Sequence, residues 1–147
     1  MGKLIKNHWA RLILLTAATY QLAAAVEGYF WPKIFWDFAT TNLNGAVKPF
    51  PYLQIVNTVF SLIGLSFEYP LPLVTRFLPS LHRNIELRLV MYPLFALACF
   101  LQYQGTNAGL YYLIGVVVLF WGFCEGEGIA PEPWTLPQRN MSGRSRV

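Results

Sequence analysis

Apolar residues are concentrated in four stretches of the chain, and the segments between them hold most of the prolines and charged residues. The approximate ranges of these stretches are 12–30, 52–69, 87–103 and 108–124. A helix of roughly 17 to 25 mostly apolar residues crosses a hydrocarbon core of about 30 Å. The pattern therefore predicts an all-α polytopic membrane protein with four transmembrane helices.

The connection between the last two stretches restricts their packing. It comprises only residues 104–107, so the third and fourth helices must be antiparallel neighbours. We expect an antiparallel four-helix transmembrane bundle over residues 1–128. Residues 129–147 have three prolines and a polar end, which is typical of an irregular tail.

The first outer loop begins with an aromatic run, EGYFWPKIFWDF, at residues 27–38. Pro32 ends the first helix, and residues 33–42 can form a short interfacial helix with Ile34, Phe35 and Phe38 toward lipid. Trp and Tyr rings suit the headgroup boundary, so we interpret Trp31, Phe35 and Trp36 as an interfacial anchor. The alternative is an aromatic ligand pocket with Glu27 at its edge.

Small and polar residues recur at helical spacing within the spans. In the second span, Gln54, Asn57, Ser61, Gly64 and Glu68 follow one another at steps of three or four and share one face. The other spans carry weaker stripes of the same kind: Ala17, Gln21, Ala24 and Gly28; Arg88, Tyr92, Ala96, Cys99 and Tyr103; Tyr111, Gly115, Val118, Gly122 and Glu125. We expect these four faces to meet in one seam, because membrane helices associate through small and polar residues.

The seam has a structural and a functional interpretation. Its polar groups either satisfy one another inside a closed bundle, or they line a cavity for a ligand. The candidate ligand-facing residues are Glu27, Gln54, Asn57, Ser61, Glu68, Arg88, Tyr92 and Glu125. The three acids lie near span ends, and an ion-pair cluster of Glu68 and Glu125 with Arg88, Arg11 and His8 is expected at the cytoplasmic end.

Composition and charge agree with a membrane protein and set its orientation. The chain is 55% hydrophobic, 16% aromatic and only 12% charged. Nine of its eleven Lys and Arg residues fall on the side of the two termini and two, Lys33 and Lys48, in the first outer loop, which places both termini in the cytoplasm. The net charge of +4 thus reflects topology and contact with the lipid bilayer, and no nucleic-acid partner is expected.

The first span resembles a signal peptide in part. Basic residues precede an apolar run, and Ala23 to Ala25 offer a cleavage site, so residues 1–25 could be removed. We favour a retained span, because apolar character continues to Trp31. Spans of 17 to 19 residues favour a thin bilayer such as that of the endoplasmic reticulum.

Motifs for catalysis are absent from the sequence. It has no H-E-x-x-H, G-x-S-x-G, Walker or Cys-x-x-Cys pattern, and His8 and His82 both flank spans. We therefore expect no metal site and no cofactor. The first functional hypothesis is a non-enzymatic membrane protein that assembles with itself or a larger membrane complex through its small and polar helix faces. The second is a small membrane enzyme or carrier for a lipid-like or small polar molecule, using Glu27, Asn57 and Glu68.

Three segments of the chain carry a resemblance to a known family. They are MGKLIKNHWARLILLTAATYQLAAAVEGYFWPKIFWDF, YQGTN-x-x-LYYLIG and PWTLP, and the likeness extends to about Pro137. The sequence resembles small four-span membrane proteins of filamentous fungi that form a domain of unknown function. This resemblance implies the four-span architecture and assigns no active residues.

Overall fold

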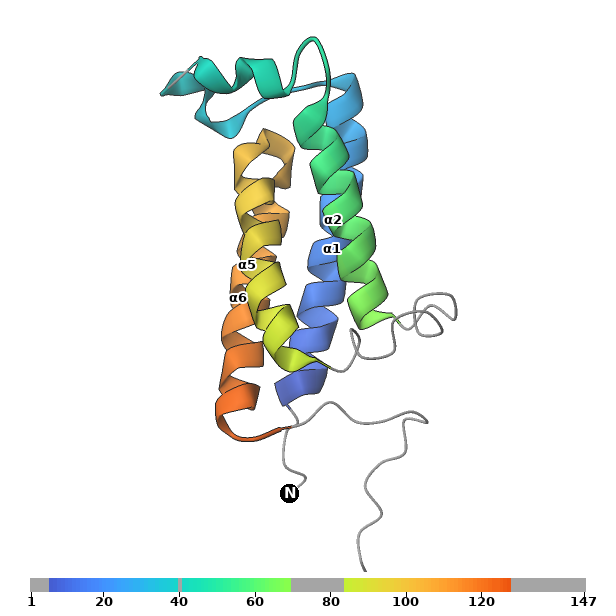
Figure 1. Ribbon diagram of the computed structural model, residues 1–147, viewed down its shortest axis with the longest axis vertical. Helices are drawn as coiled ribbons and strands as arrows, with labels where there is room; N and C mark the ends of the chain where they lie inside the picture. The colour runs from blue at the N-terminus through green and yellow to red at the C-terminus, as the bar shows by residue number, and fades with distance from the viewer. Residues whose placement is uncertain (1–5, 40, 70–83, 128–147) are drawn as a thin grey trace, which may run out of the picture.

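Four long helices form the bundle in the computed structural model, which describes residues 6–39, 41–69 and 84–127 (Figure 1). They are α1 (Lys6–Phe30), α2 (Tyr52–Glu68), α5 (Ile85–Leu101) and α6 (Thr106–Cys124). Three short 3-10 helices lie in the connections: η1 (Phe35–Phe38), η2 (Asn42–Ala46) and η3 (Tyr103–Gly105). The expected all-α four-helix bundle is confirmed. The predicted tail over 129–147 lies outside the described residues.

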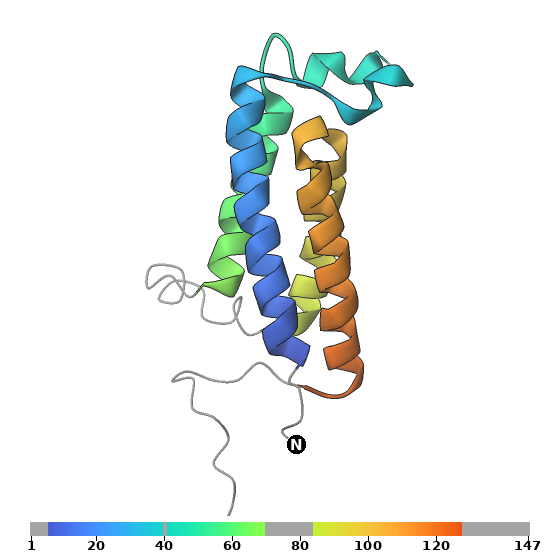
Figure 2. The ribbon, with the colours of Figure 1, turned by 180° about the vertical axis from the view of Figure 1, so that it is seen from behind.

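The helices run antiparallel in chain order, as Figures 1 and 2 show from opposite sides. We call the end that holds residues 31–51 and 102–105 the loop end, and the end where α1 begins and α6 finishes the terminal end. α1 packs along both α2 and α6, and α6 also packs along α5. α2 and α5 touch each other much less, so each has one extensive neighbour where α1 and α6 have two.

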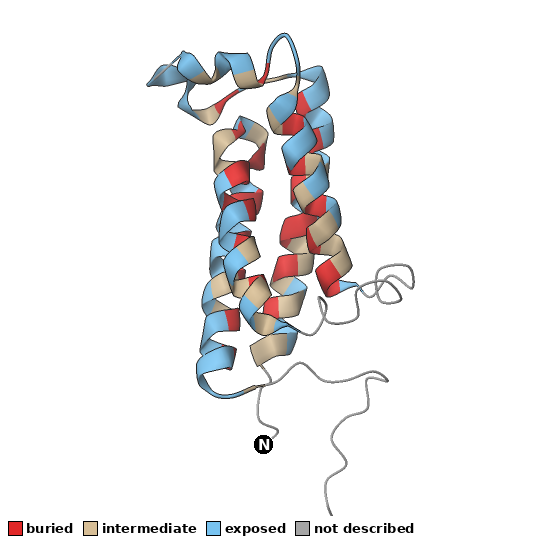
Figure 3. Ribbon diagram, viewed as in Figure 1, coloured by how far each residue is buried: buried red, intermediate tan, exposed pale blue. Residues whose placement is uncertain are grey.

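Small residues allow the helices to approach closely. α1 buries five alanines along its length: Ala10, Ala17, Ala18, Ala24 and Ala25. A Cβ added at Gly64 of α2 would lie 3.0 Å from the hydroxyl oxygen of Tyr112 and 3.2 Å from the Cβ of Ala18. The buried positions form a strip inside the bundle, while the outward surfaces of the helices are exposed (Figure 3).

The first loop differs from the expected interfacial helix. Among the described residues between 33 and 41, helical structure is limited to the four-residue η1, because the chain before it is extended and pairs with Gln102, just after α5. Ile34 forms an antiparallel bridge with Gln102 and is buried, so its predicted orientation toward lipid is wrong. Trp31 and Trp36 are exposed, as an anchor at the surface requires, and Phe35 is half-buried with its ring stacked on Tyr103.

The inward face of α6 is displaced by one residue from the predicted stripe. Tyr112 is fully buried, whereas Tyr111 is exposed and stacks on Tyr20 at the bundle surface. Leu119 is buried where the stripe had Val118, which is only partly covered. Tyr112, Gly115, Leu119 and Gly122 are spaced by three or four residues and share one helical face. Their spacing is as regular as that of the predicted stripe, so the pattern alone fits both.

Two segments are long and apolar enough to cross a membrane by length and composition. They are Lys6–Phe30, with 25 residues, and Tyr103–Cys124, with 22. α2 and α5 each have 17 residues. Length and apolarity of two helices are weak evidence of membrane association when taken alone.

Candidate functional site

The polar face of α2 lies inside the bundle along its whole length. Gln54, Asn57, Ser61, Gly64 and Glu68 are all buried, which confirms their predicted common face. Gln54, Asn57, Gly64 and Glu68 contact other helices at successive depths of the bundle. The Ser61 hydroxyl instead donates to the Thr58 carbonyl of its own helix at 2.7 Å. The seam is therefore a real feature of the fold, with α2 as its polar side.

One hydrogen-bonded chain at mid-length connects all four helices. Gln21 of α1 donates from Nε2 to Oδ1 of Asn57 at 3.0 Å, and the Tyr112 hydroxyl of α6 donates to Oε1 of Gln21 at 2.8 Å. Asn57 also donates from Nδ2 to the Ala98 carbonyl of α5 at 3.1 Å. Since all these groups are buried, their mutual bonds replace the lost contacts with water.

A charged cluster closes the seam at the terminal end. The Glu68 carboxylate is fully buried, and its Oε1 accepts from Nη1 of Arg88 at 3.0 Å and from the Tyr92 hydroxyl. Arg88 also donates from Nη2 to the Phe67 carbonyl, and Arg11 of α1 donates from Nε to the Glu68 carbonyl at 2.9 Å. The expected pairing of Glu68 with Arg88 is thus confirmed, and Arg11 joins a third helix to it.

Two buried glutamines complete the seam near the loop end. Gln54 donates from Nε2 to the Gly28 carbonyl at 3.2 Å, and Gln102 donates to the Ala24 carbonyl at 2.7 Å. A Cβ at Gly28 would lie 2.1 Å from Nε2 of Gln102, so this close approach requires glycine. The Oε1 atoms of both glutamines have no hydrogen-bond partner among the described residues.

A clasp at the terminal end holds the beginning of α1 against the end of α6. Lys6 pairs with the Glu125 carboxylate, and its ammonium lies 4.2 Å from the centre of the Trp121 ring. The Glu127 carboxylate accepts from the backbone N–H of Asn7 at 3.0 Å, and the Asn7 amide donates to the Glu127 carbonyl at 3.1 Å. Glu127 thereby caps α1, whose own first turn has no acidic residue.

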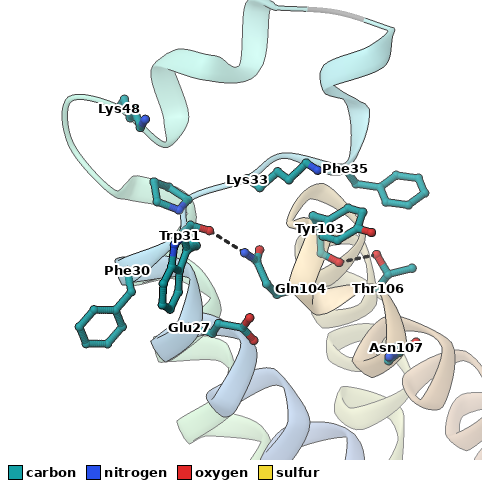
Figure 4. A pocket seen from close by; sticks show the side chains of 11 residues that line it. Glu27, Phe30, Trp31, Lys33, Phe35, Lys48, Tyr103, Gln104, Thr106 and Asn107 are labelled. Carbon is teal, nitrogen blue, oxygen red and sulfur yellow. Dashed lines mark hydrogen bonds between the residues drawn. The ribbon is translucent and has the colours of Figure 1, made fainter.

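An open hollow of 810 Å³ lies at the loop end between α1, η3 and the beginning of α6 (Figure 4). Eleven residues line it: Glu27, Phe30, Trp31, Pro32, Lys33, Phe35, Lys48, Tyr103, Gln104, Thr106 and Asn107. Glu27 is its single acid. Lys33 places its ammonium 4.6 Å from the centre of the Tyr103 ring, and Gln104 donates from Nε2 to the Trp31 carbonyl at 2.6 Å.

The predicted site residues therefore form separate groups. Asn57 lies in the mid-length chain, and Glu68 with Arg88 and Tyr92 in the terminal cluster. Glu27 and Glu125 are exposed and lie outside the seam; Glu27 lines the hollow instead, and Glu125 pairs with Lys6. Glu27 is one residue away from the stripe that ends at Gly28, and Glu125 follows the end of α6, where helical spacing no longer applies.

The combination of acids expected of an enzyme or carrier is not formed. Glu27 lies near the loop end of α1, whereas Glu68 ends α2 at the terminal end, so the length of the bundle separates them. Asn57 lies between them, with its amide engaged by neighbouring helices. No group of three His, Cys, Asp or Glu side chains that could hold a metal ion occurs within the described ranges.

Sequence reasoning missed Tyr112, Gln102 and Glu127. Tyr111 and Tyr112 are adjacent and both fit the helical spacing, so the sequence pattern did not show which of them faces the seam. Gln102 lies just beyond α5, where a polar residue normally indicates only a turn, yet its side chain is buried against α1. The lack of an acidic residue in the first turn of α1 was the available signal that an acid from elsewhere, such as Glu127, could stabilise this end.

Comparison with known proteins gives one match. A family model described as a domain of unknown function (DUF7727) matches residues 1–127, which cover the bundle from before α1 to the clasp at Glu127. No curated protein and no solved structure matches the chain. By the extent of the family match, the chain belongs to this family, the domain of unknown function DUF7727.

Proposed function

We propose that this chain is a four-span integral membrane protein that acts without catalysis, by assembling with itself or with a larger membrane complex. The observation that carries the membrane part is an inverted distribution of polarity. Among the described residues, seven polar or charged side chains are buried: Gln21, Gln54, Asn57, Ser61, Glu68, Arg88 and Gln102. The outward surfaces of the helices instead expose large apolar residues, which in water would favour aggregation.

This distribution includes α2 and α5, the two shorter helices. Val59 and Leu62 of α2 and Val90 and Leu97 of α5 are between 47% and 63% exposed. No charged residue occurs in 53–67 or 89–101, whereas a surface helix of a soluble bundle has a charged outer face. Lipid around all four helices accounts for this surface.

Helix length and charge support the orientation and the choice of membrane. A helix of 17 residues is about 25 Å long, close to the thinner hydrocarbon core of the endoplasmic reticulum. Lys33 and Lys48 lie at the loop end, while the larger share of Lys and Arg belongs to the side of the termini. We therefore place the loop end in the lumen and both termini in the cytoplasm, in line with the likeness to small fungal membrane proteins.

The state of the seam favours assembly over catalysis. Most of its polar side chains bond to other groups of the bundle, although Oε1 of Gln54 and of Gln102 have no partner among the described residues. Neighbouring side chains of the same molecule occupy the space beside its glycines. The small faces are therefore occupied within the bundle, so a partner must contact the outer surface. We assign that contact to the outer surfaces of α2 and α5, because each has only one extensive neighbour.

The enzyme or carrier hypothesis has one observation in its favour, the hollow at the loop end with Glu27. It remains the second candidate. The two hypotheses predict different sensitive positions. Substitutions on the outer surfaces of α2 and α5 should impair assembly, whereas substitutions in the hollow should impair an enzyme or carrier.

Photo-crosslinking in native membranes tests the assembly proposal. A photoreactive residue at Leu62 or Leu97 should give a discrete adduct, of twice the chain mass for self-association or of a larger defined mass for another protein. Val117 of α6 is the matched control, since it is 65% exposed on a helix with two extensive neighbours. The same products from all three positions would contradict the assigned surface, and lipid adducts alone would contradict assembly.

A further inference from the structure

The hollow at the loop end continues into a groove on the side of the bundle. The groove has a volume of 390 Å³ and lies between α1 and α6, where Tyr20, Asn107, Leu110, Tyr111 and Ile114 line it. Asn107 lines both spaces, so they adjoin at this residue. A larger hollow that contains charged side chains thus adjoins a smaller open groove, lined chiefly by Tyr, Leu and Ile side chains, along α1 and α6.

The hollow contains charged groups that the described protein does not pair with one another. The carboxylate of Glu27 has no hydrogen bond or ion pair within the described ranges, and it points into the space between α1 and η3 (Figure 4). Lys33 and Lys48 belong to the lining of the same hollow, and the ammonium group of Lys33 lies over the Tyr103 ring. An acid and two bases therefore face one open volume.

Gln104 adds an uncharged acceptor to this set. Its Nε2 is held by the Trp31 carbonyl, which fixes the direction of the amide. Its Oε1 is buried and has no hydrogen-bond partner among the described residues. A buried acceptor without a partner is costly, so a ligand that draws this oxygen toward the hollow and donates a hydrogen bond to it would be favoured.

We propose that the hollow and groove bind one phospholipid whose headgroup carries a primary amine, such as a phosphoethanolamine lipid. The ammonium group supplies three N–H donors, which suit the Glu27 carboxylate and Oε1 of Gln104. The phosphate lies toward Lys33 and Lys48, and one acyl chain follows the groove past Leu110 and Ile114.

The dimensions of the two spaces fit this arrangement. Glu27 and Tyr20 are seven residues apart on α1, about 10 Å along the helix. The Tyr20 and Tyr111 rings stack with centroids 5.7 Å apart, and they form an apolar wall beside Leu110 and Ile114. The headgroup end of the site lies at the bundle end and its apolar part at membrane depth, so this inference rests on the proposed membrane placement.

Binding of two lipids with identical chains tests the proposal directly. The full chain, purified in a mild detergent and freed of lipid, is titrated with dioleoyl phosphoethanolamine or dioleoyl phosphocholine, and bound lipid is counted by native mass spectrometry. The choline headgroup has no N–H to donate, so we expect about tenfold weaker binding, the effect of one charge-assisted hydrogen bond. Equal affinity for the two lipids would overturn the proposal.

Variants assign the preference to the hollow. Glu27→Gln should remove most of the preference for phosphoethanolamine, while Asp37→Asn, which removes an acid outside the hollow at the same end of the bundle, should retain it. Both positions are exposed, so neither change disturbs the packed seam. A preference that survives Glu27→Gln unchanged would contradict the assigned role of this carboxylate.

The groove is tested separately from the headgroup. Leu110→Trp should fill it and weaken binding of the lipid, whereas Leu113→Trp, on the same helix but outside the groove, should not. Glycerophosphoethanolamine, which has the headgroup without chains, should compete much more weakly than the lipid. Competition at equal concentration would show a headgroup site alone and overturn the lipid proposal. Because these assays use detergent, their failure leaves the proposed four-span topology, which is measured by labelling, unaffected.

Discussion

Arg88 and Glu68 form a buried ion pair between α5 and α2, with 3.0 Å between Nη1 and Oε1. Glu68 is fully buried and Arg88 is 4% exposed. Removal of one partner from such a pair leaves a charge in a medium that cannot solvate it. The pair therefore helps to fix how α2 meets α5 at the terminal end, together with the edge-to-face contact of the Phe67 and Tyr92 rings.

Glu68→Gln should lower the melting temperature strongly, because Arg88 loses its counter-charge; the expected loss of stability is about 3 kcal/mol. The double variant with Arg88→Met should recover part of it, since no unpaired cation remains. Thermal unfolding in detergent measures Glu68→Gln, Arg88→Met and the double variant. Glu86→Gln serves as an exposed control on α5. Strictly additive losses would show that the two side chains are not coupled.

Gly64→Leu should disrupt the bundle far more than Leu65→Ile. The leucine side chain would extend from a Cβ that already lies 3.0 Å from the Tyr112 hydroxyl and 3.2 Å from Ala18, so α1, α2 and α6 would have to separate. Leu65 is only partly buried and keeps its volume in the control. Gel filtration and melting in detergent report the difference, and equal tolerance of both changes would mean that this face of α2 is open.

Tyr112→Phe should cost about 1–3 kcal/mol, because it leaves Oε1 of Gln21 buried without its donor. Tyr111→Phe makes the same chemical change one residue earlier on the exposed face and should be nearly neutral. Detergent melting of the pair checks the register of α6 in the seam. A larger loss for Tyr111→Phe would reverse the assignment.

Helical spacing predicts the seam well where one set of residues satisfies it. In α2, five small or polar residues follow steps of three or four among apolar neighbours, and all five are buried. The Glu68–Arg88 pair was predictable for the same reason, since both end stripes at the terminal end. Spacing fails in α6, where adjacent tyrosines fit equally well and contacts with other helices select Tyr112: its hydroxyl bonds to Gln21 of α1, and its ring stacks on Tyr92 of α5.

Contacts made by residues outside the helices could not be read from local pattern. Ile34 looks like part of an interfacial helix, but the extended chain around it pairs with Gln102, some 70 residues later. Glu125 and Glu127 follow α6, and their partners Lys6 and Asn7 lie at the other end of the chain. Such pairings depend on the path of the backbone between elements, which periodicity does not determine.

Labelling of single cysteines measures whether the chain crosses the membrane four times. In sealed vesicles with the cytoplasmic face outward, a membrane-impermeant maleimide is applied to three single-cysteine proteins. They carry the exposed native Cys124, Asn44→Cys at the loop end, or Glu86→Cys at the beginning of α5. Position 86 decides between topologies, because it lies across the membrane from position 44 only if α2 spans, and α5 and α6 must then both span to return the chain to the side of Cys124. We predict that 86 and 124 are labelled at once and that 44 is labelled only after the vesicles are permeabilised. Protection of position 86 together with position 44 would reduce the spans to α1 and α6 and contradict the four-span account.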